Sequence, residues 1–223
     1  MIFFIDEISI MRRNFEYSLK DVKALVDLYD SIVETKITYH YIQYESLKRS
    51  SLFLLTASWE NYIEDTLKLS FESLLEKVKI PEEIESTFNS VANSWLDNYK
   101  DRKPKAPDLI YWTNDNWKDI IRHKLNRDID NLNTPNSKNI EHLFKIYFGE
   151  KLESIFILNN YSIVSIKNKL DKLIEIRGEI AHQAKKELSK SKLKISLKYV
   201  KESINFIESL VNSTENNFVK KYS

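Results

Sequence analysis

The chain has 223 residues, 42% of them hydrophobic, which is enough apolar material for a core at the upper end of single-domain size. Basic and acidic residues nearly cancel, 34 against 33, so the net charge of +1 gives no nucleic-acid signature for the molecule as a whole. The absence of cysteine excludes a disulfide framework, a thiol nucleophile and a thiolate zinc site, and a cytoplasmic location is expected. Two glycines and four prolines leave few hairpin turns, so the composition favours an all-α protein.

The N-terminal third predicts two long helices. An apolar run over residues 1–5 stops at Asp6, too short for the core of a signal peptide, and no later stretch approaches a membrane span. Apolar residues recur at steps of three and four over residues 8–33 and again over residues 52–74, which puts each set on one helical face. Pro81 suits the first turn of a further helix.

The middle of the chain, residues 100–135, is the irregular part. The run 100–107 is rich in lysine and proline and indicates an exposed loop, Pro135 marks a second break, and a short helix is expected between them. Tyr111, Trp112 and Trp117 could stack on nucleic-acid bases. Aromatic residues more often anchor an insertion onto the core, and this second interpretation is the one we favour.

The last third has the clearest pattern. Apolar residues step by three and four over residues 163–184 and again over 193–218, so two helices are expected with a polar link at 185–192. Long helices joined by short links predict an up-and-down helical bundle with long antiparallel helices. We therefore expect one domain over residues 1–223, interrupted by the irregular insertion at about 100–135.

Arg177 occupies a position of the apolar stripe where leucine or isoleucine is expected. A guanidinium stays charged at ordinary pH, and its unpaired burial would cost roughly several kcal/mol, so a carboxylate or a phosphate should lie nearby. The second long helix offers Glu60, Glu64 and Asp65. Glu60 is the first choice because it adjoins Trp59 on the core stripe, although such a pair could also be a purely structural one that fixes helix register.

His182 follows Arg177 by five residues, which places the two side chains about 140° apart around an undistorted helix. Gly178 could relax the backbone locally, the helix could end near His182, or two copies of the motif could meet across a two-fold axis. A lone histidine near a helix end is usually a favourable C-terminal charge. Its pairing with a misplaced arginine makes His182 a candidate functional residue.

The segment Arg177-Gly178-Glu179-Ile180-Ala181-His182, with Ser58-Trp59-Glu60-Asn61-Tyr62 upstream, resembles the HEPN (higher eukaryote and prokaryote nucleotide-binding) superfamily. The RiboL-PSP-HEPN and MAE-type branches, which read Arg-Asn-x-Ile-Ala-His, are the most similar. The resemblance implies a HEPN-like bundle, a homodimer whose two Arg-x4-His motifs share a cleft, and RNase activity without a metal or another cofactor. Gly178 departs from the usual polar residue, often asparagine, and Ala184 replaces the tyrosine of the Arg-x4-His-x-Tyr variant.

Arg177 and His182 are the expected catalytic residues, with Glu60 and Gly178 in supporting positions. Histidine can move a proton near neutral pH, and a fixed arginine can stabilise a developing phosphorane, which together suit RNA cleavage by the neighbouring 2′-hydroxyl.

Lys185 and Lys186 are the expected nucleic-acid contacts. They lie in residues 161–201, which hold eleven basic residues against four acids. Such a segment attracts phosphate, although lysines on an outer helix face also serve as ordinary solvated charges.

The sequence thus predicts a bacterial endoribonuclease acting as a toxin or antiviral defence effector, with an antitoxin or defence-system partner and no membrane association. Two alternatives stay open. One is a non-catalytic module that binds RNA, a nucleotide or a protein, and the other is a purely structural helical protein.

Overall fold

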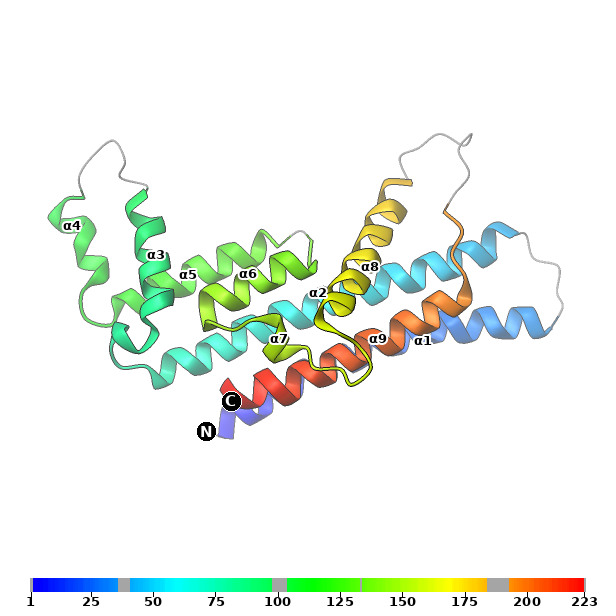
Figure 1. The fold of residues 1–223 in the computed structure, drawn as a ribbon, viewed down its shortest axis with the longest axis horizontal. Helices are drawn as coiled ribbons and strands as arrows, with labels where there is room; N and C mark the ends of the chain where they lie inside the picture. The colour runs from blue at the N-terminus through cyan, green and yellow to red at the C-terminus, as the bar shows by residue number, and fades with distance from the viewer. Residues whose placement is uncertain (1, 36–40, 98–103, 133, 184–192, 223) are drawn as a thin grey trace.

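The computed structural model describes residues 2–35, 41–97, 104–132, 134–183 and 193–222. All regular elements within these ranges are helical, which confirms the all-α bundle. Helices α1 (Ile2–Glu34), α2 (Tyr41–Lys77) and α9 (Leu197–Thr214) run lengthwise, with the two chain termini at the same end, and α8 (Ile163–Gln183) crosses α2 (Figure 1). Within the described ranges no helix is long and apolar enough to cross a bilayer.

The apolar stripes predicted for α1 and α2 pack on each other, and α2 also contacts α9. Burial of the α1 stripe holds from Met11 to Val26, whereas Val33 in the last turn is 49% exposed, so the buried stripe is shorter than the apolar pattern. Arg12 on α1 donates hydrogen bonds to Asn212 and to Glu215, which fixes the first helix against the C-terminal segment.

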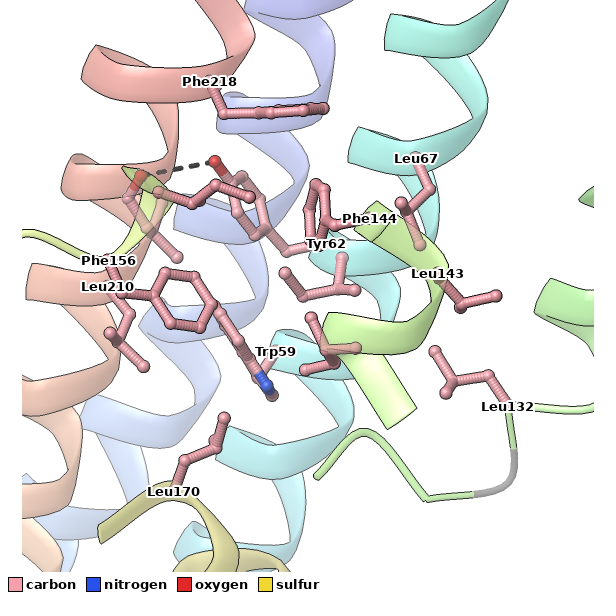
Figure 2. Packing of buried hydrophobic residues seen from close by; sticks show 14 of the residues in the cluster. Trp59, Tyr62, Leu67, Leu132, Leu143, Phe144, Phe156, Leu170, Leu210 and Phe218 are labelled. Atoms are coloured by element: carbon pink, nitrogen blue, oxygen red, sulfur yellow. Dashed lines mark hydrogen bonds between the residues drawn. The ribbon is translucent and has the colours of Figure 1, made fainter. Parts of the chain in front are cut away.

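Trp59 and Tyr62 of α2 lie at the centre of the core (Figure 2). The Trp59 ring packs on Phe156 at a centroid distance of 6.0 Å, and the Tyr62 hydroxyl donates to the Val211 carbonyl of α9 at 3.3 Å. Buried aromatic side chains of this size contribute roughly 3–5 kcal/mol each, as judged from truncation to alanine. Because Trp59 fixes the rotation of α2, it also fixes the direction of Glu60, the next residue.

The further helix predicted at Pro81 is formed by η1 (Pro81–Ile84) and α3 (Glu85–Leu96). The described part of residues 100–135 contains α4 (Ala106–Leu109), η3 (Ile110–Trp112) and α5 (Asn116–Asp130), and it is therefore more helical than the one short helix predicted there. Pro81 stands in the first turn of η1, as predicted. Trp117 is 3% exposed, and Trp112 packs edge-on against Phe88 and Trp95. The tryptophans therefore anchor this segment, and the Tyr111 side chain lies outside the described residues.

The elements that follow carry the chain back to the core. They are α6 (Ser137–Phe148), α7 (Leu152–Ile155), α8, α9, the π-helical η4 (Glu215–Val219) and α10 (Lys220–Tyr222). Asp171 of α8 accepts hydrogen bonds from the backbone N–H and the hydroxyl of Ser137, at 2.7 and 2.8 Å. These two hydrogen bonds join α8, the helix that carries Arg177, to the start of α6.

Candidate active site

Arg177 continues the apolar stripe of α8 after Leu170 and Leu173, which are buried. The Arg177 side chain is 30% exposed. It therefore lies at the margin of the α2–α8 contact and is partly open to solvent. This position explains how the stripe accepts an arginine, and it leaves the charge open to an anion.

Glu60 of α2 is the carboxylate that meets Arg177, as predicted from its place beside Trp59. Arg177 Nη2 lies 3.6 Å from Glu60 Oε2. Burial raises the pKa of Glu60, the positive charge of Arg177 opposes that rise, and the nearby Glu64 carboxylate adds to it. Since burial dominates, the ion pair does not fully offset the cost of placing this carboxylate in the helix contact.

Phe53 also holds the guanidinium, and the sequence analysis missed it. Arg177 Cζ lies 5.3 Å from the centroid of the Phe53 ring, within the range of a cation–π contact. Phe53 precedes Glu60 by seven residues, two helical turns, so both side chains stand on the same face of α2. The signal in the sequence is an aromatic residue seven positions before Glu60 and directly after Leu52 of the core stripe.

His182 lies exposed in the last turn of α8. The helix runs unbroken from Ile163 to Gln183, and Gly178 has no positive φ, so the glycine does not turn the backbone towards convergence. The end of α8 projects away from α2 (Figure 1). Within one chain, therefore, the angle of about 140° between Arg177 and His182 persists.

Gly178 faces open space. A Cβ built at this position meets no heavy atom within 4 Å, so packing inside one chain does not require a glycine. Lys185 and Lys186, the predicted phosphate contacts, lie outside the described residues. Within the part of the chain that is described, no three histidine, aspartate or glutamate side chains gather as a set of metal ligands.

The chain returns to the bundle after the motif through contacts with the start of α2. Arg49 Nη1 donates to the carbonyl of Leu193 at 3.5 Å, and the backbone N–H of Ile195 donates to Glu45 Oε2 at 3.4 Å. Lys48 forms an ion pair with Glu45 at 2.5 Å, and both side chains are at most about one-tenth exposed. These contacts join the N-terminal side of α9 to α2, the helix whose Glu60 and Phe53 contact Arg177.

One family model, RiboL-PSP-HEPN, matches residues 16–220. The match spans α2, α8 and α9 and includes the segments whose motifs resemble the HEPN superfamily, so that resemblance is confirmed. No curated protein matches the chain, and no solved structure does.

Proposed function

This chain belongs to the RiboL-PSP-HEPN family, and we propose that it is an endoribonuclease that cleaves RNA without a metal ion. The observation that carries the proposal is the arginine of the Arg-x4-His motif, held partly exposed between Glu60 and Phe53. Two rigid helices fix it, which is the preorganisation that stabilisation of a developing charge requires. Family membership by itself supports the broader statement, an RNase or an RNA-binding module.

In the proposed reaction the 2′-hydroxyl of the RNA attacks the adjacent phosphorus atom. His182 accepts the hydroxyl proton and returns a proton to the departing 5′-oxygen, while Arg177 stabilises the negative charge on the non-bridging oxygens. The P–O5′ bond breaks as the P–O2′ bond forms. The products are a 2′,3′-cyclic phosphate and a 5′-hydroxyl, and DNA is resistant because it lacks the attacking group.

Two copies of the chain would complete the site. Arg177 and His182 diverge on one straight helix, His182 is exposed at its end, and Gly178 between them leaves open space for a second surface. A two-fold axis at this point brings the arginine of one protomer towards the histidine of its partner. We propose this homodimer as the active species, with Lys185 and Lys186 as phosphate contacts.

Family resemblance alone supports the biological part of the proposal. We propose on that basis that the enzyme is a bacterial toxin or antiviral effector, restrained by an antitoxin or a defence-system partner.

The test is incubation of mixed cellular RNA in EDTA with the wild type, His182→Ala and Arg177→Ala. His123→Ala, an exposed histidine of α5, is the matched control. We expect fragments with cyclic phosphate ends from the wild type and the control, and at least about a hundredfold less from the two motif variants. End-group analysis and thermal melting check the chemistry and the fold.

Fragments in equal yield from all four proteins would contradict the proposed roles. Intact RNA that nevertheless binds the wild type would favour the alternative function, a module that recognises RNA without cutting it. Gly178 in place of the usual polar residue is the feature that favours this alternative.

A further inference from the structure

The segment between α7 and α8 passes beside α9 (Figure 1). Together with the last turns of α9 and with η4, it lines a hollow of about 440 Å³. Its volume falls within the range of small-molecule sites, about 300–1,000 Å³. Seven of the ten lining residues are asparagines or serines, one is Tyr161, and none is charged. Such a lining suits a neutral, planar, polar group.

Two of the lining amides have their orientation fixed by a cation. Asn212 Oδ1 accepts a hydrogen bond from Arg12 Nη1 at 2.7 Å, and Asn216 Oδ1 accepts one from Lys220 Nζ at 2.7 Å. Arginine and lysine can only donate, so the amide oxygen must face the cation in both cases. The NH₂ groups of Asn212 and Asn216 are then the donors left for a ligand.

The Asn217 amide has the opposite orientation, with its NH₂ group already hydrogen-bonded to the protein. Its Nδ2 donates to the Ile155 carbonyl at 3.2 Å, so its Oδ1 is the acceptor left for a ligand. Asn216 and Asn217 are neighbours in the π-helical η4, Glu215–Val219, and single π-helical turns occur often at functional sites. Of the five asparagines that line the hollow, these three therefore offer two amide donors and one amide acceptor.

Tyr161 supplies an aromatic surface at the same place. Its side chain is 41% exposed, its ring packs edge-on against Phe206 at 6.2 Å, and Lys169 Nζ lies 3.3 Å from its hydroxyl. These contacts fix the ring while part of it lines the hollow. Lys169 adds one positive charge beside a lining that is otherwise neutral. This charge is placed to contact the phosphate group joined to a bound base.

We propose that this hollow is a subsite for the base of a nucleotide, with the base against Tyr161 and its polar edge on Asn212, Asn216 and Asn217. Pyrimidines are the favoured bases. Uracil and cytosine each present two acceptors and one donor on their pairing edge, the complement of the three amides, whereas guanine presents one acceptor and two donors.

The assignment of RNA as the source of the base rests on the proposed function. From Ile163 to Arg177 α8 rises about 20 Å at 1.5 Å per residue, so the bound base lies several nucleotides from the cleaved bond. The subsite would therefore position a single-stranded RNA across the face of the protein and give it a pyrimidine preference away from the site of cleavage.

The experiment measures binding of hexauridylate and hexaadenylate whose 2′-hydroxyls are replaced by fluorine, so that neither is cleaved. The proteins are the wild type, Asn216→Ala, Tyr161→Leu and the control Asn93→Ala, which removes an exposed asparagine of α3. Fluorescence anisotropy at fixed salt gives the affinities, and thermal melting checks the fold. UMP is titrated separately and followed by NMR.

We expect hexauridylate to bind the wild type more tightly than hexaadenylate, and its Kd to rise at least about fivefold in Asn216→Ala and Tyr161→Leu. Asn216→Ala also frees the Lys220 charge, so weaker binding could not be assigned to lost electrostatic attraction. Asn93→Ala should bind as the wild type does. Loss of UMP binding in the variants, with unchanged hexauridylate affinity, would identify a base site for a free nucleotide.

Equal affinity of the wild type and both variants for hexauridylate and for UMP would overturn the proposal, as would no binding of either probe. Failure of the proposed nuclease is seen separately, as intact cellular RNA in the cleavage test with the wild type. The two failures are therefore distinguishable.

Discussion

Arg177 combines a place in the helix contact with the role proposed for it in catalysis. Its aliphatic part continues the stripe of α8, and its guanidinium contacts Glu60 and the face of Phe53. A carboxylate fixes the charge from one direction, and an aromatic face does so without consuming a hydrogen-bond donor. Arg177 can therefore be held in place and still offer N–H groups to a phosphate.

Replacement of Glu60 by glutamine separates these two roles. Burial raises the pKa of Glu60, so the folded protein holds this proton more tightly than the unfolded chain does. The resulting stability is fully present below the ordinary pKa of 4.5 and is lost as pH rises through the raised value. At pH 7 we expect Glu60→Gln to melt at or slightly above the wild-type temperature, while cleavage falls about tenfold because Arg177 is less well fixed.

Thermal melts at pH 7 and pH 4, with cleavage assays at pH 7, make the comparison. At pH 4 both proteins carry a neutral side chain at position 60, so any difference in melting temperature should shrink. A variant that melts several degrees lower at pH 7 and keeps full activity would make the Glu60–Arg177 pair a structural one that fixes helix register.

At the scale of elements, the long helices were predictable because each buries one continuous stripe. The period of three and four residues located α1, α2, α8 and α9. Helices α3 to α5 were not located by this period, although Pro81 predicted a helix after it and a short helix was expected within residues 100–135. Their burial depends on contacts among aromatic residues distant in sequence, such as Phe88 with Trp112 and Trp117, which no local period reveals.

The residues of the candidate site also divide into those that the sequence predicts and those that it does not. Glu60 was predictable because it adjoins Trp59 on the core stripe, and the structure pairs it with Arg177. Phe53 was not, because an aromatic residue off the stripe acquires a role only once α8 is placed over it. The amide hollow was also missed, since the asparagines of α9 and η4 occupy positions that read as an ordinary solvent-facing side of the helix.

Gly178 gives a prediction at this same scale. A glycine inside a helix costs roughly 0.5–1 kcal/mol relative to alanine, and a Cβ here would meet nothing within one chain. We therefore expect Gly178→Ala to raise the free energy of unfolding by about that amount, measured by urea denaturation at low protein concentration. A lower free energy of unfolding would show that the position is strained or packed.

For the whole molecule, the decisive property is that one continuous α8 carries the two proposed catalytic side chains about 140° apart around the helix. Arg177 contacts Glu60 of α2, whereas His182 is exposed in the last turn of α8. That end of α8 projects away from α2 (Figure 1). Because α8 is unbroken at Gly178, the proposed site would take its arginine and its histidine from two chains. Each site of the proposed dimer then combines the arginine of one protomer with the histidine of its partner.

Mixing two inactive variants tests this arrangement directly. Arg177→Ala and His182→Ala are each expected to be inactive alone, since every site in either dimer lacks one group. After subunit exchange half of the dimers contain both chains, and one of their two sites has an intact arginine and an intact histidine. We expect the mixture to recover about a quarter of wild-type activity, measured with the same RNA after exchange. A mixture as inactive as its components would place both groups in one protomer, and activity in either variant alone would remove that residue from the chemistry.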